Sequence, residues 1–194
     1  MQRLGDGHLA AAARTAAAAF HDDPLLKIVQ PDVARRPAAG RWFMGVALTY
    51  ALRHGEVWGN EDASAVAAWL PPDKHLSTMD LLRAGMARLP LVVGLRGAAR
   101  TMGAMSATEP FHKQVKGPHW YLMMLATDPS RQGQGLGSQL TEVGTAQADA
   151  AGIPVYLETG TDANIAFYRK RGFEIMGQAD AAGFTLTAML RQPR

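Results

Sequence analysis

The sequence of 194 residues contains no cysteine. This absence excludes disulfide bonds, zinc sites with cysteine ligands, and catalysis through an acetylated cysteine. It is consistent with a cytoplasmic protein, since disulfide-dependent folds belong to oxidising compartments. Any chemistry that this chain performs must therefore depend on other side chains.

Long apolar runs and long runs of one charge are also scarce. The most apolar stretch, 89–107, is interrupted by Pro90, Arg96 and Arg100, so it is poorly suited to cross a bilayer. The first residues lack the apolar segment of a signal peptide. The net charge is only +3, and the charged residues are scattered. We therefore expect binding neither to nucleic acid nor to membranes.

What the sequence does contain is an ordered series of helix and strand signals. Apolar periodicity and turn residues predict helices at 8–20 and 33–54, a hairpin at 56–70, weaker helices within 73–117, a strand at 119–126, a helix at 136–150, a strand at 154–159, a helix at 162–171, and strands at 173–178 and 184–190. The nearly continuous apolar run at 119–126 predicts a strand buried on both faces. The order predicts a single α+β domain over 1–194, with α/β/α layers and a helical insertion at about 73–117.

A glycine-rich loop, Arg131-Gln132-Gly133-Gln134-Gly135-Leu136-Gly137-Ser138, lies between a predicted strand and a predicted helix. Its glycines let a ligand approach the backbone, and free amides at the start of a helix favour an anion such as a pyrophosphate. The loop has no lysine, which excludes a Walker loop, and Ser138 stands where a dinucleotide fingerprint requires glycine. The remaining pattern, Gln132-x-x-Gly135-x-Gly137, resembles the CoA-binding loop of GNAT acetyltransferases. A tight turn that merely opens the helix is the alternative.

The resemblance extends over the C-terminal part of the chain. Segments 122–129 and 152–159 are similar to the fourth and fifth strands of the GNAT family, and 164–173 resembles its closing Asn-x-x-x-Phe-Tyr-x-x-x-Gly-Phe segment. The upstream half, with Asp23-Pro24, is most similar to the branch that includes puromycin N-acetyltransferase. One departure is visible. Only Met1–Leu4 is available for the family's first strand, which we expect to be truncated or absent.

The resemblance implies a mostly antiparallel central sheet with one splayed pair of strands, flanked by helices. It also implies acetyl-CoA as cofactor, with its pantetheine arm in the splayed gap, and no metal. The residues expected to hold it are Leu125, Ala126 and Thr127 on the strand, Arg131, Gln132, Gly133, Gln134, Gly135, Leu136, Gly137 and Ser138 in the loop, and Asn164 near the thiol. Arg169 or Lys170 would reach the adenosine phosphates.

By the same resemblance, the reaction is direct attack of a small molecule's primary amine on the thioester. Tyr168 is the expected general acid, and the alternative is a tyrosine that only packs in the core. Glu158 is the expected base, because a lone carboxylate in a buried strand is unfavourable unless it is paired or used. It would act directly, through water, or only as an anchor for the ammonium. The alternative is a glutamate at a frayed strand end that faces solvent.

Several features leave more than one interpretation open. Asp22 and Asp23 fit an acidic acceptor pocket or, more simply, a turn before a proline. His119 fits a proton relay or a structural histidine. The insertion at 73–117 fits a lid, a packed helical pair or a homodimer contact. A protein or peptide N-acetyltransferase and a non-catalytic acyl-CoA-binding module remain the alternative functions, and the identity of the amine acceptor is not encoded in any motif.

Overall fold

The computed structural model describes residues 1–74 and 76–194, so position 75 of the predicted insertion lies outside the described residues. The elements in chain order are β1 (Gln2–Arg3), α1 (Leu9–Ala19), α2 (Pro24–Val29), α3 (Arg36–His54), β2 (Glu56–Gly59), β3 (Ala65–Leu70), α4 (Thr78–Ala84), α5 (Leu89–Ser106), α6 (Glu109–His112), β4 (Trp120–Thr127), α7 (Leu136–Ala151), β5 (Val155–Thr159), α8 (Asp162–Arg169), β6 (Glu174–Asp180) and β7 (Thr185–Arg191). Short 3-10 turns lie at Asp6–His8, Met86–Arg88 and Pro129–Arg131.

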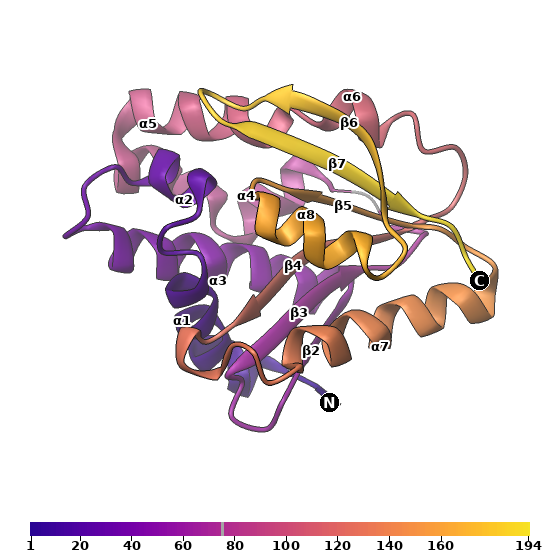
Figure 1. Cartoon of the computed structure of the whole chain (residues 1–194). Coiled ribbons are helices and arrows are strands. Elements are labelled where there is room, and N and C mark those ends of the chain that lie inside the picture. The colour runs from indigo at the N-terminus through magenta and orange to yellow at the C-terminus, as the bar shows by residue number, and fades with distance from the viewer. Residues whose placement is uncertain (75) are drawn as a thin grey trace.

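The strands of the described chain form one seven-stranded sheet in the order β1-β2-β3-β4-β5-β7-β6. All neighbouring strands are antiparallel except β4 and β5, which are parallel. Helices cover both faces, and Figure 1 shows α8 crossing in front of the sheet while α1 and α3 lie behind it. The predicted mostly antiparallel α+β fold is confirmed. The first strand is indeed truncated, since β1 has only two residues.

The parallel pair β4 and β5 separates part-way along its length. Residues Trp120–Leu122 are in register with Val155–Leu157, and the pairing ends there. The remaining residues of β4 still pair with β3 on their other edge, up to Thr127. The C-terminal halves of the two strands therefore diverge, which is the splay that the sequence led us to expect.

A β-bulge lies at the point of divergence. Ala68 on β3 is opposite Met124, and the next residue, Trp69, is opposite Leu122, so Met123 is an extra residue on β4. A bulge bends its strand and reverses which residues face which side. Accordingly, Leu122 packs in the core under α7, whereas Met124 packs in the core under α1 and α3. β4 therefore contributes buried residues to the cores on both faces of the sheet, while the residues between them are only partly buried.

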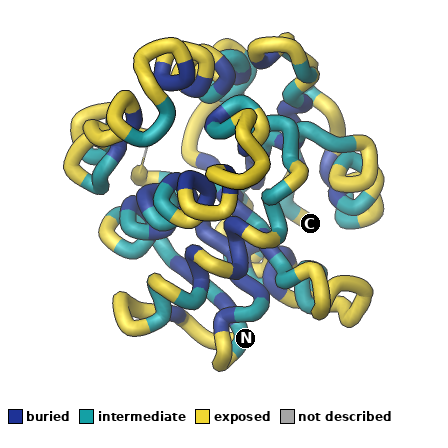
Figure 2. The backbone as a smooth tube through the Cα atoms, turned by 90° about the vertical axis from the view of Figure 1, so that its left-hand side faces the viewer, coloured by how far each residue is buried: buried dark blue, intermediate teal, exposed yellow. Residues whose placement is uncertain are grey.

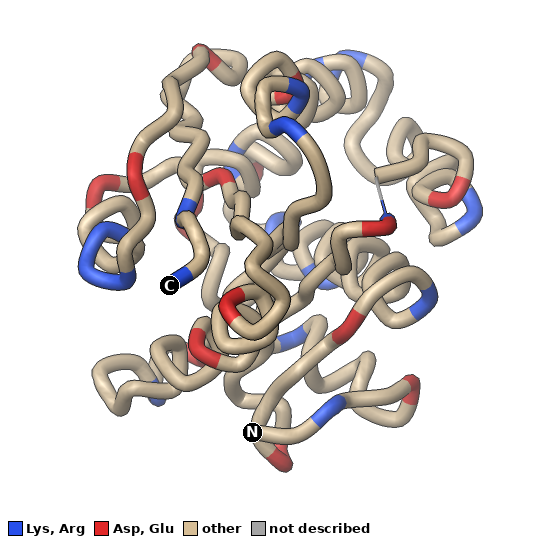
Figure 3. The backbone as a smooth tube through the Cα atoms, turned by 90° about the vertical axis from the view of Figure 1, so that its right-hand side faces the viewer, with Lys and Arg blue, Asp and Glu red and all other residues tan. Residues whose placement is uncertain are grey.

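Two apolar cores fill the spaces between the layers. One lies among α1, α2, α3 and the adjoining strands, and the other lies between the sheet and α7 and α8. In Figure 2 the buried segments concentrate at the strands and at the inner turns of the helices, while the outer turns are exposed. Lys, Arg, Asp and Glu are spread over many elements in Figure 3.

Helix α2 was not predicted. In the sequence, Asp23-Pro24 was interpreted only as a turn that ends the preceding helix. A proline is also well suited to the first turn of a helix, where its missing N–H costs nothing. Asp23 caps α2 by accepting a hydrogen bond from the Leu25 amide at 2.9 Å. Leu26 and Val29 are fully buried, so packing stabilises a helix that is too short to persist alone.

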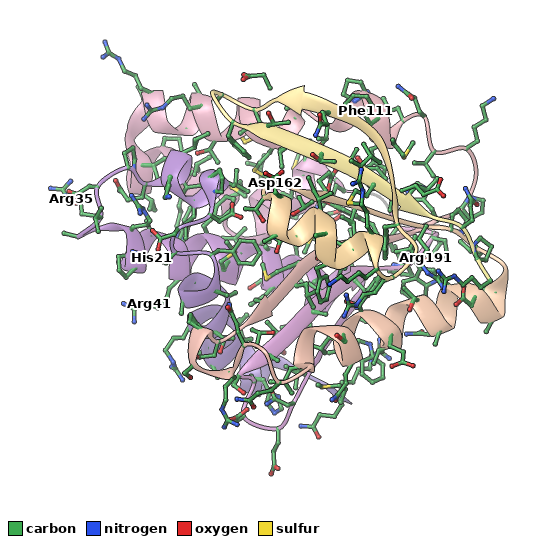
Figure 4. The ribbon with its side chains drawn as sticks, in the orientation of Figure 1. His21, Arg35, Arg41, Phe111, Asp162 and Arg191 are labelled. Carbon is green, nitrogen blue, oxygen red and sulfur yellow. The ribbon has the colours of Figure 1, made fainter. Side chains whose placement is uncertain are left out.

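An ion pair joins the end of β7 to the C-terminal turn of α7, and Figure 4 labels its arginine, Arg191. The Arg191 guanidinium donates two hydrogen bonds of 2.7 Å to the two carboxylate oxygens of Asp149. The Arg191 side chain is only 6% exposed, so its charge depends on this partner. The Asp149 carboxylate also accepts from the Arg194 amide. Above all, the hydrogen bonds from Arg191 lower the pKa of Asp149 below its usual range.

We expect Asp149→Asn to lower the free energy of unfolding by about 3 kcal/mol at pH 7, because it leaves the buried Arg191 charge uncompensated. Since the pKa of Asp149 is depressed in the fold, the stabilisation is present above the unfolded value near pH 3.9 and is lost as pH falls through the folded pKa. Urea unfolding at pH 7 and pH 3 measures both. Glu142→Gln, at an exposed side chain of the same helix that makes no ion pair within the described chain, is the control and should change little. Equal stabilities of parent and Asp149→Asn at pH 7 would contradict the assignment.

Candidate active site

Strand alternation places Glu158 on a defined face of β5. Val155 and Leu157 point into the core under α7 and α8. Successive side chains of a strand point to opposite faces, so Tyr156 and Glu158 share the other face. Tyr156 is fully buried and Glu158 is partly buried, at the end of β5 that has parted from β4. The alternative of a freely solvated strand end does not hold for Glu158.

Both carboxylate oxygens of Glu158 accept hydrogen bonds from residues far away in the sequence. The Thr108 hydroxyl donates to Oε1 at 3.1 Å, and the Tyr121 hydroxyl donates to Oε2 at 2.6 Å. Burial of the carboxyl group among protein atoms raises the pKa of Glu158, and the hydroxyl donors partly oppose this shift. The residue as a whole is only partly buried, while its carboxyl group is almost enclosed by protein atoms.

Tyr156 brings a third hydroxyl to this cluster. It is fully buried, and its hydroxyl makes no hydrogen bond of ordinary geometry with any residue that the structure describes. It still lies close enough to Glu158 for the two groups to shift each other's pKa: the pKa of Tyr156 rises, through burial first and the nearby carboxylate second. Burial likewise raises the pKa of Tyr121, so both hydroxyls keep their protons at neutral pH.

Two histidines close the cluster on the side of α6. The Nε2 atoms of His112 and His119 are 2.8 Å apart, and His119 Nδ1 is 3.1 Å from the Gly117 carbonyl oxygen. A carbonyl oxygen can only accept, so the His119 Nδ1 atom donates to Gly117. If the His119 ring is neutral, its Nε2 atom then accepts a hydrogen bond from the His112 Nε2–H. The His112 ring stacks on Tyr156 with a centroid distance of 4.3 Å. His119 is thus buried and hydrogen-bonded, and it holds α6 against the start of β4.

Phe111, the neighbour of His112 on α6, packs against β6 (Figure 4). A Cβ built on Gly177 would lie 2.2 Å from its ring, so the glycine makes room for Phe111. The predicted insertion contains α4, α5 and α6. Its last part, with Thr108 and α6, therefore forms one wall around Glu158.

Tyr168 lies on the opposite face of the sheet from Glu158. It is buried in the core under α7, and its ring lies 5.1 Å from the Phe167 ring and 5.5 Å from the Phe173 ring. Burial raises its pKa, and the nearby Arg171 charge partly opposes the shift. Because the two candidates lie on opposite faces of the sheet and β5 has parted from β4 at Glu158, they can act together only across the gap between the strands.

The glycine loop opens α7 with unpaired amides. Gly135 has φ +79°, a left-handed conformation that favours glycine, and no atom lies within 4 Å of where a Cβ would stand. The Gln139 amide makes the first backbone bond of the helix, to the Gly135 carbonyl at 3.1 Å. Among the described residues, the amides of Leu136, Gly137 and Ser138 have no backbone acceptor. These amides and the helix dipole form an anion site.

Arg171 lies beside this helix start, and the sequence reading had not singled it out. Its guanidinium stacks on Phe167 at 3.4 Å from the ring centroid, and it donates hydrogen bonds to the Ser138 hydroxyl and to the Phe167 carbonyl. Within the described chain it has no carboxylate partner. Arg169 and Lys170, which were expected to reach the adenosine phosphates, are both exposed.

The other predicted cofactor residues surround the gap. Leu125–Thr127 pair with β3 on one edge of β4 and have no strand partner on the edge that faces β5. The Gln132 side chain reaches the Thr127 carbonyl at 3.4 Å. Arg131 is 3.4 Å from Asp62 of the β2–β3 turn. Asn164 is exposed in the first turn of α8, where its amide donates to the Thr161 hydroxyl.

Asp22 and Asp23 do not form an acidic pocket. Asp23 caps α2, and Asp22 is 3.8 Å from the buried guanidinium of Arg36, which also bonds three backbone carbonyls. The turn interpretation of these residues is the one that fits. A surface hollow of about 270 Å³ lies elsewhere, beside β1 and β2, and is lined by Arg3–Asp6, Leu52 and Gly55–Val57. It lies at the β1–β2 edge of the sheet, with β3 and β4 between it and β5, so it does not mark the acceptor site.

The family model of the Acetyltransferase (GNAT) family matches residues 61–173, which is more than half of the chain. The chain belongs to the GNAT acetyltransferase family. An acetyltransferase of this family must bring an acetyl donor to its acceptor, and the matched range includes β4, the glycine loop, Glu158 and Tyr168. The loop resemblance that the sequence suggested is therefore a family relationship, whereas a place in the puromycin N-acetyltransferase branch stays a prediction.

Three solved acetyltransferase structures share the fold over nearly their whole length. A histone acetyltransferase HPA2 and related acetyltransferase from Corynebacterium glutamicum is 24% identical with a TM-score of 0.68, covering 100% of this chain and 95% of that one. Arylalkylamine N-acetyltransferase 2 from Aedes aegypti is 14% identical with a TM-score of 0.71, covering 100% and 98%. A polyamine N-acetyltransferase from Drosophila melanogaster is 16% identical with a TM-score of 0.64, covering 98% of each chain.

Of the residues now around Glu158, sequence reasoning missed Thr108, Tyr121, Tyr156 and His112. Tyr156 carried a usable signal, since it stands two residues from Glu158 in a strand and must share its face. The others carried none, because they come from separate elements.

In the described part of this GNAT chain, no helix is both long and apolar enough to cross a membrane.

Proposed function

We propose that this acetyltransferase transfers the acetyl group of acetyl-CoA to a primary amine of a small molecule. The observation that carries the proposal is the buried, hydrogen-bonded carboxylate of Glu158 at the end of β5 that has parted from β4. A carboxylate whose pKa is raised by burial is suited to remove a proton near neutral pH. Amine acylation needs such a base, because a free amine is mostly ammonium at pH 7.

The residues present fit acetyl-CoA. The unpaired amides of Leu136, Gly137 and Ser138 suit a pyrophosphate, and the open space at Gly135 lets it approach the backbone. The unpaired edge of β4 can hydrogen-bond a pantetheine arm as an added strand would. In the proposed complex, Leu125–Thr127, Arg131–Ser138 and Asn164 hold the donor. Arg171 adds a positive charge beside the pyrophosphate site.

When bound, acetyl-CoA supplies an acetyl group on a thiol that can leave. Glu158 takes one proton from the ammonium, so that the nitrogen becomes neutral and nucleophilic. As the C–N bond forms and the C–S bond breaks, the Tyr168 hydroxyl donates its proton to the departing sulfur. Tyr168 regains a proton from the nitrogen, which loses its second one on becoming an amide. The proton on Glu158 passes to solvent, which balances the reaction.

A small amine is favoured as acceptor over a peptide. Structural neighbours are named for arylalkylamines, agmatine and polyamines. In this chain Thr108, at the start of α6, hydrogen-bonds Glu158, and a carboxyl group buried in this way suits a small molecule better than an extended peptide. A peptide acceptor is the second candidate, because another neighbour is named as a histone acetyltransferase.

A thiol-release assay with acetyl-CoA and a panel of amines tests the proposal. The panel should hold arylalkylamines, agmatine, polyamines, puromycin and a histone-tail peptide. Release that depends on a small amine supports the proposed function, and release with the peptide alone favours the second candidate. Acetyl-CoA binding without release in any arm would indicate an acyl-CoA-binding module.

Gly135→Asp is expected to abolish acetyl-CoA binding in calorimetry. The aspartate would place negative charge at the proposed pyrophosphate site and strain a backbone with φ +79°. Gly152→Asp is the matched control, since Gly152 ends the same helix with φ +66° and equally open space. This control should suffer the same strain but keep binding. Undiminished binding by Gly135→Asp would show that the loop does not hold the cofactor.

A further inference from the structure

The polar cluster around Glu158 has capacity left for a ligand. An ionised carboxylate offers about four acceptor positions, and Thr108 and Tyr121 each fill one. The hydroxyl of Tyr156 is enclosed and makes no hydrogen bond of ordinary geometry with the described residues, although Glu158 and Thr108 lie near it. A buried polar group without a partner is unfavourable and calls for an explanation. Here it stands beside the Glu158 carboxylate, close enough for each group to shift the pKa of the other.

The rings around these oxygens favour a cation. Tyr121, Tyr156 and His112 are packed together, with centroid distances of 5.8 Å for the two tyrosines and 4.3 Å for His112 on Tyr156. Tyrosine rings attract cations through their π faces. The hydroxyls of Tyr121 and Tyr156 stay protonated because burial raises the pKa of each, so the one acidic group that the cluster presents is Glu158.

We propose that Glu158 and the Tyr156 hydroxyl together bind the ammonium group of the acceptor, and that the site selects primary amines with no carboxylate on the neighbouring carbon. One ammonium N–H donates to Glu158 and a second to the Tyr156 oxygen. Thr108 and Tyr121 are positioning residues that hold the carboxylate. This inference rests on the proposed function, and it names the class of amine that the site accepts.

The selectivity follows from charge. An α-amino acid that placed its ammonium on Glu158 would bring its own carboxylate within a few ångströms of the same group. Like charges at such a distance in a partly buried site are strongly disfavoured. Amines formed by loss of that carboxylate keep the cation without the repulsion. An amino-acid decarboxylation is the class of reaction that would supply such acceptors.

The test compares three matched acceptors: phenethylamine, phenylalanine and phenylalanine amide. The amide has the bulk of phenylalanine but no carboxylate, so it separates size from charge. We expect phenethylamine to exceed phenylalanine on the order of 100-fold in kcat/KM, with the amide close to phenethylamine. Equal use of phenylalanine and phenethylamine would overturn the selectivity, and equally poor use of the amide and phenylalanine would show that size decides.

Tyr156→Phe removes only the unpaired hydroxyl. We expect the KM for the amine to rise about tenfold or more, with a smaller change in kcat and none in acetyl-CoA affinity. The melting temperature should barely change, because no hydrogen bond of ordinary geometry is lost. Tyr121→Phe is the comparison variant. It should act through Glu158 and move the acidic limb of the pH–rate profile to higher pH, since its hydroxyl lowers the pKa of Glu158.

Calorimetric binding of phenethylamine to the parent and to Tyr156→Phe makes the test independent of turnover. If the parent binds acetyl-CoA but acetylates no amine, the proposed function fails while the amine affinities still decide this inference. Tenfold weaker amine binding by Tyr156→Phe supports it. Equal amine affinity of the two proteins, or no amine binding by either, would overturn it.

Discussion

Tyr168→Phe is expected to lower the turnover number roughly 10²–10⁴-fold with a good amine acceptor, the usual contribution of a positioned general acid. The variant keeps the ring that packs between Phe167 and Phe173 and removes only the hydroxyl. Acetyl-CoA affinity and the melting temperature should barely change, and both serve as controls for folding. Steady-state kinetics at saturating acetyl-CoA measure the effect.

The pH dependence of that loss is a second check. Because burial raises the pKa of Tyr168 above its ordinary value, the hydroxyl stays protonated throughout the neutral range. The loss should therefore be similar from pH 6 to pH 9. Undiminished turnover in Tyr168→Phe would mean that water or another group protonates the sulfur. The buried tyrosine would then be a packing residue, as the alternative sequence interpretation held.

Glu158→Gln is expected to lower kcat by about 10²-fold or more if Glu158 is the base. Glutamine keeps the shape and can still accept from one hydroxyl donor, but it cannot take a proton. The acidic limb of the pH–rate profile should be lost or displaced, and high pH should partly rescue the variant, because more amine arrives neutral. Full kinetics from pH 5 to pH 10 give both parameters.

Two other outcomes of Glu158→Gln are informative. A raised KM with nearly intact kcat would mean that Glu158 only anchors the ammonium. Parent-like values of both parameters at every pH would remove Glu158 from the mechanism. Thr108→Val is a useful companion, because it deletes one hydrogen bond to the carboxylate and leaves the base in place. Its effect should be a modest shift of the acidic limb to higher pH.

The same variant has an expected signature in stability. The pKa of Glu158 is raised in the fold, so between the unfolded value near 4.3 and the folded value the folded state binds more protons than the unfolded chain. The parent should therefore lose stability as pH rises through this window, and the loss persists above it. Glu158→Gln should lack this slope. The difference in free energy of unfolding between the variant and the parent should therefore shift in favour of the variant as pH rises. Parallel curves would contradict the raised pKa.

Much of the fold was predictable because its signals are local. The break at Gly135 and the stop at Gly152 bound α7, and the structure places that helix at Leu136–Ala151. The hairpin at 56–70 and the last two strands were likewise evident from apolar patterns between turn residues. Helix α2 was missed, because a proline can either end one helix or begin the next. Only the packing of Leu26 and Val29 in the core decides that Pro24 begins a helix here.

The candidate site divides in the same way. Glu158 and Tyr168 could be selected from the sequence, since each stands in a short motif whose spacing resembles that of the GNAT family. The faces of the sheet on which Glu158 and Tyr168 lie could not be predicted from the sequence. Met123 is one apolar residue in an apolar run, and nothing local marks it as the bulge beside which β4 and β5 part. That bulge is a product of pairing with β3, a contact between residues far apart in the chain.

The sequence by itself determined the order of the elements, the glycine loop that opens α7, and the two residues proposed for catalysis, because these depend on neighbours within one turn or one strand. The tertiary structure alone decided what surrounds Glu158. Thr108 is 50 residues away and Tyr121 is 37 away, and their hydroxyls meet the carboxylate only because the sheet and α6 bring them together. Hydrogen bonding and burial at that meeting point set the pKa of Glu158, and neither can be read from a linear pattern.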